Sequence, residues 1–336
     1  MPDAVEHSDV RRALIEKYLQ KKRLQPTKDA GTVSERLQKT ENVEPRARVT
    51  PIQAGGAKRP FFFLHGHWLG TAFYCYPLAA SLGADQPFYA LEPYSFDGLP
   101  IPPKIENIAA AHIKVMQAIQ PDGPYLIGGF CNGALVAYEM ALQLDAQEQK
   151  VDLLALLDPM AMGHTLPVYQ RFLRRLTNLL RDPHKQLDWF VRLRHILRES
   201  YNYLRSLLPW WSGDVEVDWD PDTGNGDDKA QPTRPRIAAI IPSHEAIHWD
   251  YVAMVEWAVL DYRPRGVYPG KITFLWPQET LEHVKWWDQV TKAAKIEEHF
   301  VPGTQVSWKS KHIRELSECL QGCFSTTADV KIRKKE

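Results

Sequence analysis

The segment Gly129-Phe130-Cys131-Asn132-Gly133 places a cysteine between two glycines, directly after the apolar stretch 125–128 and at the start of the helix-like stretch 133–144. A strand, a Gly-x-nucleophile-x-Gly turn and a helix in this order are typical of a nucleophile elbow, because the glycines allow the chain to double back at the middle residue. We expect the positive end of the helix dipole to favour the thiolate of Cys131. The pattern predicts nucleophilic catalysis by Cys131, and a small core cysteine behind a glycine-rich strand end is the alternative.

Backbone N–H groups that could stabilise an oxyanion can be assigned from the same pattern. In an elbow site one donor is the N–H of the residue after the nucleophile, which is Asn132 here. The second donor comes from the turn after an earlier strand, which is His67 in His65-Gly66-His67-Trp68. We therefore predict that Asn132 and His67 form an oxyanion hole. The two histidines are expected to act through their backbone or through packing, and not as bases or metal ligands.

An acidic side chain is expected close to Cys131, because a catalytic base has to be oriented by a third group. The apolar stretch 151–157 is typical of a strand, and it stops at Asp158. The Asp158 carboxylate is therefore expected at the same edge of the sheet as Cys131. Glu279, which follows the strand-like stretch 271–276, is the alternative acid. Asp158 could also be an ordinary turn residue without a catalytic role.

The elements that must position these residues alternate between strands and helices, which indicates an α/β fold with a mostly parallel central sheet and helices on both faces. Between Asp158 and Lys271 lies an insertion far longer than an ordinary connection, and we predict that it forms a helical lid at about 163–250, with a helical pattern over 168–206. The predicted strands are 61–64, 88–91, 125–128, 151–157, 271–276 and 299–301, and the predicted helices are 77–82, 105–120, 133–144 and 313–319.

The remaining parts of the chain are expected to be appendages to one α/β domain at 49–325. Residues 1–48 are predicted to hold a helix at 8–24 followed by a polar, proline-punctuated linker. Residues 326–336 form a basic tail.

Composition narrows the class of protein. The 336 residues carry 41 basic and 41 acidic side chains, and this balance argues against a nucleic-acid-binding protein. No apolar run approaches the roughly 18 residues of a membrane span, and the charged start lacks the apolar core of a signal peptide, so we expect a cytoplasmic protein without a membrane partner. The cysteines show no disulfide-framework spacing. Cys319 and Cys323 lie one helical turn apart, with no cluster of His or Cys nearby in the sequence, so we expect reduced thiols and no metal.

Residues 59–322 resemble the α/β-hydrolase thioesterase family that works with nonribosomal peptide and polyketide synthetases. The acid follows the nucleophile by 158 − 131 = 27 positions, as in that family. The resemblance implies an α/β-hydrolase fold, a substrate held as a thioester on the phosphopantetheine arm of an acyl or peptidyl carrier protein, and no cofactor of the chain's own. The matching segments are Phe62-Phe63-Leu64-His65-Gly66, Gly128-Gly129-Phe130-Cys131-Asn132-Gly133, Leu156-Leu157-Asp158-Pro159 and Val301-Pro302-Gly303, and the stretch 13–19 resembles segments found beside carrier modules.

Two positions depart from the family. Most members have serine where this chain has Cys131, and the family's catalytic histidine corresponds to Gln305. A cysteine stores the acyl group as a thioester, which suits transfer between thiols. Glutamine cannot accept a proton near neutral pH, and general-base help typically contributes about 10²–10⁴-fold to a rate, so release of the product should be slow. Three possibilities stay open: His312 acts as the base, Gln305 is an engineered replacement, or the protein needs no strong base.

These features predict a thioesterase or acyltransferase of natural-product biosynthesis, such as antibiotic production, that forms an acyl-enzyme on Cys131 with an acyl, aminoacyl or peptidyl group. The acid Asp158 and the position of Gln305 complete the predicted catalytic set. The alternatives are a dienelactone-hydrolase-like cysteine hydrolase and a catalytically silent protein that docks carrier proteins. The stretch 168–206 carries nine Arg and Lys against three Asp and Glu, and it could contact an acidic carrier protein or be a solvated helix face.

Overall fold

The computed structural model describes residues 46–66, 72–96, 103–160, 168–207, 251–278, 287 and 295–328. Several sequence predictions lie outside these residues, namely the helix at 8–24 with its linker, His67, Glu279 and the part of the predicted lid beyond residue 207. Within the described ranges, no helix is both long and apolar enough to cross a membrane.

Within the described residues, seven strands form one sheet in the order β1-β3-β2-β4-β5-β6-β7. The edge strand β1 runs antiparallel to β3, and every other neighbouring pair is parallel. This topology confirms the predicted mostly parallel sheet of an α/β-hydrolase fold. The strands are β1 (Val49–Gln53), β2 (Phe61–Leu64), β3 (Phe88–Leu91), β4 (Tyr125–Phe130), β5 (Val151–Leu157), β6 (Lys271–Pro277) and β7 (Lys295–Val301).

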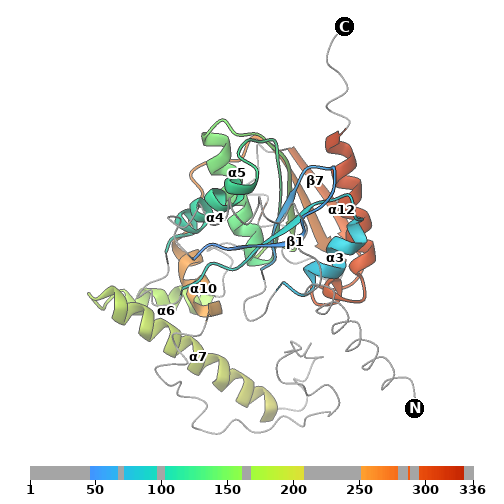
Figure 1. Ribbon diagram of the computed structural model, residues 1–336. Helices are drawn as coiled ribbons and strands as arrows, with labels where there is room; N and C mark the ends of the chain where they lie inside the picture. Colours follow the sequence, from blue (N-terminus) through green and yellow to red (C-terminus); the bar gives the residue numbers. More distant parts are fainter. Residues whose placement is uncertain are drawn as a thin grey trace, which may run out of the picture. The chain divides into compact units, whose positions relative to one another are not determined.

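Helices cover both faces of the sheet, as Figure 1 shows for α4 and α5 on one face and α3 and α12 on the other. The central strands are continuous apolar runs because a parallel strand between two helical layers is buried on both faces. All residues of β2, β3 and β4 are buried. The helices are α3 (Cys75–Leu82), α4 (Ile105–Ile119), α5 (Asn132–Ala146), α6 (Val168–Thr177), α7 (Pro183–Leu207), α10 (Tyr251–Asp261) and α12 (Ile313–Ala328), with a short 3-10 helix at Ser307–Lys309.

Two elements differ from the sequence prediction by more than two residues at one end. Strand β7 begins at Lys295 and not at 299, because this edge strand alternates between exposed and partly buried residues and lacks a continuous apolar run. Helix α12 continues from Ile313 to Ala328, well beyond the predicted end at Cys319. The longer helix extends alongside the longer strand, and the two elements contact each other.

The predicted helical pattern over 168–206 is confirmed as α6 and α7, which pack against each other, and α7 also contacts α10. The Arg194 guanidinium on α7 makes a bidentate ion pair with Glu256 on α10, and both side chains are buried. Arg174 on α6 pairs with Asp261 and stacks 3.4 Å from the centre of the Trp257 ring. Two of the basic residues of this segment therefore hold the helices together instead of facing a partner.

Candidate active site

Cys131 forms the turn between β4 and α5 with φ 53° and ψ −117°, a conformation that side-chain-bearing residues rarely adopt. The Cys131 N–H donates to the Leu157 carbonyl at 2.9 Å. The Cys131 carbonyl accepts hydrogen bonds from the N–H groups of Ala134 at 3.2 Å and Met160 at 3.0 Å. Such a backbone conformation costs about 1–3 kcal/mol and persists only where its surroundings hold it, which is typical of functional sites. The structure thus has the elbow that the sequence predicts.

The flanking glycines are required by close packing around the elbow. A Cβ atom added to Gly129 would lie 2.5 Å from the Ala134 Cα atom, and one added to Gly133 would lie 2.5 Å from the Leu64 carbonyl oxygen. Real Cβ atoms do not approach other atoms this closely. The Gly-x-Cys-x-Gly pattern therefore lets α5 turn back directly over β4 and approach β2.

The surroundings of Cys131 raise the pKa of its thiol, and burial is the main cause. The negative charge of Asp158 raises it further, whereas a hydrogen bond from the Gln305 side chain, one from the Asn132 N–H and the positive charge of Lys309 act in the opposite direction. The Asn132 N–H at the start of α5 favours the thiolate, as expected of a helix N-terminus, but removal from water outweighs it and the net pKa is raised. At neutral pH the site therefore holds a thiol in most molecules.

The raised pKa predicts a specific pH dependence for alkylation of Cys131. The rate with iodoacetamide, followed on the peptide that contains Cys131, should rise about tenfold per pH unit from neutrality and level off above the usual thiol pKa of about 8.5. Asp158→Asn should move this profile to lower pH, because it removes a charge that opposes the thiolate. Gln305→Ala should move it to higher pH. A wild-type profile that levels off below pH 8 would contradict the prediction.

Asp158 lies where the sequence predicts, directly after β5 and beside β6. It has φ 38°, its N–H donates to the Leu275 carbonyl at 2.9 Å, and its side chain is buried. Its carboxylate is close enough to Cys131 to influence the pKa of the thiol. The parallel strands therefore bring the predicted acid and nucleophile to the same edge of the sheet, while the alternative acid Glu279 lies outside the described residues.

Gln305 belongs to the loop that follows β7, and its side chain hydrogen-bonds to Cys131. The loop is held by reciprocal hydrogen bonds between Thr304 and Ser307, in which the Thr304 N–H donates to the Ser307 hydroxyl at 2.8 Å and the Ser307 N–H donates to the Thr304 hydroxyl at 3.3 Å. The buried Trp308 indole N–H donates to the Pro302 carbonyl at 2.9 Å. Gln305, where the resemblance predicts a histidine, is thus in contact with Cys131.

His312 contacts the same loop. Its Nδ1 atom lies 2.9 Å from the Ser307 hydroxyl oxygen, and its N–H donates to the Ser307 carbonyl at 2.9 Å. A Cβ atom added to Gly303 would lie 2.3 Å from His312 Nδ1, so the ring packs directly on the loop. These contacts give His312 a role in fixing the loop that carries Gln305, and they do not support its use as a replacement base.

One of the two predicted oxyanion donors lies in the described part of the chain. The Asn132 N–H, at the start of α5, hydrogen-bonds to Cys131, and the Asn132 side chain is buried with no hydrogen-bond partner for its Oδ1 atom among the described residues. His67 lies outside them. The preceding His65 is fully buried, with Nε2 2.8 Å from Glu92 Oε2, and the Tyr74 hydroxyl donates to its carbonyl oxygen. His65 thus has the packing role expected from the sequence.

A small, partly open hollow lies beside the elbow. Its lining combines apolar side chains, such as Val136 and Val255, with Asn132 and His112. Burial, together with the charge of His65, lowers the pKa of His112 to about 4, so this imidazole is neutral at physiological pH. Sequence reasoning missed His112, because a histidine within an amphipathic helix carries no signal of its own.

The mostly parallel sheet with helices on both faces has the α/β-hydrolase fold. Residues 60–215, less than half of the chain, match the family model described as the thioesterase domain. Two solved structures share the fold. The NocB thioesterase domain in covalent complex with a fluorophosphonate nocardicin G analogue is 16% identical, with a TM-score of 0.51 over 82% of this chain and 98% of that chain. The NocB thioesterase domain from the nocardicin cluster is 17% identical, with a TM-score of 0.50 over 84% of this chain and 100% of that chain.

Curated relatives are similar over part of this chain. Chondramide synthase cmdD of Chondromyces crocatus is 36% identical over 132 residues, which are 38% of this chain and 3% of the synthase. The dimodular nonribosomal peptide synthase of Bacillus subtilis (strain 168) is 32% identical over 138 residues, which are 40% of this chain and 6% of that protein. The matched segment is therefore a small part of much longer multidomain proteins.

Proposed function

We propose that this chain is a thioesterase-like acyltransferase of natural-product biosynthesis. It takes an acyl, aminoacyl or peptidyl group from the phosphopantetheine arm of a carrier protein onto Cys131 and passes the group to a second acceptor. The observation that carries this proposal is the elbow cysteine with Gln305 hydrogen-bonded to it and Asp158 close by at the same edge of the sheet. The thioesterase-domain match and the synthase relatives support the class of substrate.

In the first step the Cys131 thiolate attacks the carbonyl carbon of the carrier-bound thioester. The Asn132 N–H stabilises the oxyanion that forms. When the oxyanion collapses, the bond between the carbonyl carbon and the pantetheine sulfur breaks. Cys131 has released its proton to solvent before the attack, and the leaving thiolate takes a proton from solvent, so the protons balance. One thioester replaces another, so the step is close to balanced in free energy.

In the second step the acceptor attacks the Cys131 thioester. Water is a poor nucleophile without a general base, and the Gln305 amide cannot take its proton. A thiolate or a free amine needs less help, because its nucleophilic form exists near neutral pH. The site therefore favours transfer to a thiol or an amine over hydrolysis.

Incubation with an acyl-loaded carrier protein, followed by intact-mass measurement, tests the proposal. The wild-type chain should gain the mass of the acyl group, and peptide mapping should place the group on Cys131. Cys131→Ala should gain no mass, whereas Cys319→Ser, as a matched loss of another thiol, should still be acylated. Loss of acyl groups from the carrier with Cys131→Ala would place turnover elsewhere and contradict the proposal.

A catalytically silent docking protein is the second candidate, and the raised pKa of Cys131 beside Gln305 favours it. The same experiment separates the two. Binding of the carrier protein without any transfer of mass, even at a pH that ionises the thiol, would identify a docking role.

A further inference from the structure

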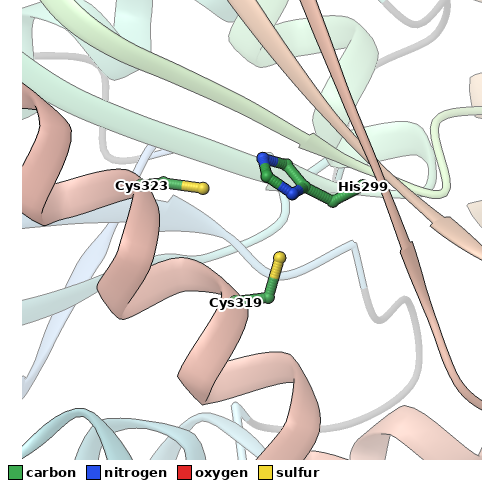
Figure 2. A group of neighbouring side chains, drawn as sticks. All are labelled: His299, Cys319 and Cys323. Carbon is green, nitrogen blue, oxygen red and sulfur yellow. The ribbon is translucent and has the colours of Figure 1, made fainter.

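His299, Cys319 and Cys323 lie together on the face of the sheet covered by α12, and Figure 2 shows their side chains converging from β7 and α12. Their candidate ligand atoms all lie within 4.8 Å of one another. The sequence places no other His or Cys close to the two cysteines, whereas the fold brings His299 beside them. The third member comes from an edge strand about twenty residues away in the chain, which spacing in the sequence could not reveal.

The fold positions these side chains on firmly packed elements. In β7 the residues Glu297, His299 and Val301 are less exposed than their neighbours, so they share the face towards the protein. Cys319 and Cys323 lie four positions apart and therefore share one face of α12. The two thiols are close enough to hydrogen-bond to each other. The helix is anchored by the buried side chains of Leu316 and Leu320 and by the Phe324 ring, which contacts Phe61 at a centroid distance of 5.0 Å.

The imidazole of His299 has an unsatisfied atom at this place. Its Nε2 atom is buried and has no hydrogen-bond partner among the described residues. The carboxylate oxygen Glu297 Oε1 is 3.4 Å away, without the geometry of a hydrogen bond. Buried polar atoms without a partner are rare in native proteins, and coordination of a metal ion is one way in which a buried imidazole nitrogen is satisfied.

We propose that His299, Cys319 and Cys323 bind a thiophilic divalent cation of the Zn²⁺ class. Two sulfur ligands and one imidazole are a donor set typical of Zn²⁺ sites, whereas Mg²⁺ and Ca²⁺ select oxygen ligands. Binding converts both thiols to thiolates and releases two protons to solvent, so the two ligand charges balance the charge of the ion. Glu297 is not part of this group, and its carboxylate pairs with Lys271, so the fourth position of a tetrahedral site would be left to solvent.

The site would tie α12 to β7 and would lie just before the loop that carries Gln305. Strand β7 ends at Val301, and Gln305 follows four residues later. The cation is a structural ligand in this proposal, and it takes no part in the chemistry at Cys131.

Substitution with Co²⁺ tests the site directly. Tag-free protein, reduced and then freed of reductant, should bind one Co²⁺ per chain and develop a thiolate-to-cobalt absorption band in the near ultraviolet, and Zn²⁺ should displace the cobalt and remove the band. Cys319→Ser, Cys323→Ser and His299→Ala should each weaken binding by at least about tenfold, as losses of metal-site partners commonly do. Circular dichroism checks that each variant is folded.

Cys131→Ser is the matched control, because it removes a thiol outside the cluster and should leave the band and the stoichiometry unchanged. If Cys131→Ser abolishes the band, the cation binds at the elbow and the proposal is wrong. Absence of the band in the reduced wild-type protein would also overturn it. Protein purified under air without chelator provides a further check. A disulfide between Cys319 and Cys323, seen as a mass lower by two hydrogens, would overturn the proposal, because the pair would then be a redox dithiol.

Discussion

Gln305→His is expected to raise the rate of product release by about 10²–10⁴-fold, the usual contribution of a general base. The Gln305 side chain already reaches the Cys131 sulfur, and Asp158 lies close to the same atom, so an imidazole at 305 would stand between a nucleophile and an acid. It would take the proton of the attacking water or hydroxyl while the carboxylate stabilises the imidazolium. Single-turnover kinetics, started from the acyl-enzyme on Cys131, measure release separately from loading.

Gln305→Asn is the matched control, because it keeps an amide at the position and supplies no base, so it should bring no gain. The double variant Gln305→His with Cys131→Ala should form no acyl-enzyme at all. Release that stays slow in Gln305→His, in a folded protein that still loads, would mean that Asp158 does not orient a base at this position. The hypothesis that the site is built for a histidine it lacks would then be wrong.

Arg194→Met is expected to lower the free energy of unfolding by about 3–5 kcal/mol, because it leaves the Glu256 carboxylate buried without its partner. The exposed fractions of the two side chains are only 7% and 9%, and the pair is bidentate. Methionine keeps much of the volume of the arginine stem, so the loss reports mainly the unpaired charge. Urea unfolding at neutral pH, read as the change in midpoint at constant slope, measures the effect.

Two further variants make this test specific. Arg314→Met breaks the exposed pair between Arg314 and Glu318 on α12, whose side chains are 82% and 58% exposed, and should cost no more than about 1 kcal/mol. The double variant Arg194→Met with Glu256→Leu should recover most of the stability, because an apolar pair can replace a buried ion pair at little cost. A loss below about 1 kcal/mol for Arg194→Met would show that water reaches Glu256 and that α7 is not tightly packed on α10.

Much of the framework could be predicted from the sequence, because it depends on local patterns. Continuous apolar runs such as 61–64 and 151–157 can be recognised as strands buried on both faces. The elbow is coded by two glycines whose positions leave no room for a Cβ atom. Because β4 and β5 are parallel neighbours, their carboxyl ends lie at the same edge of the sheet. Cys131 and Asp158 directly follow these ends, so they are expected to be close together.

Properties that depend on distant contacts could not be predicted in the same way. The pKa of Cys131 is raised by burial, which results from how several elements close around the elbow. The cluster of His299 with Cys319 and Cys323 requires the register of an edge strand whose pattern is not apolar. The pair of Arg194 and Glu256 joins residues 62 positions apart and carries no local signal.

The hydrogen bond from the Met160 N–H to the Cys131 carbonyl at 3.0 Å has a mechanical consequence. Met160 begins the stretch of chain that leads to α6 and α7. A backbone hydrogen bond therefore joins Cys131 to the start of the helical insertion. A pull on that stretch therefore acts on the end of β5, to which it is covalently joined, and also, through this hydrogen bond, on the peptide unit at Cys131.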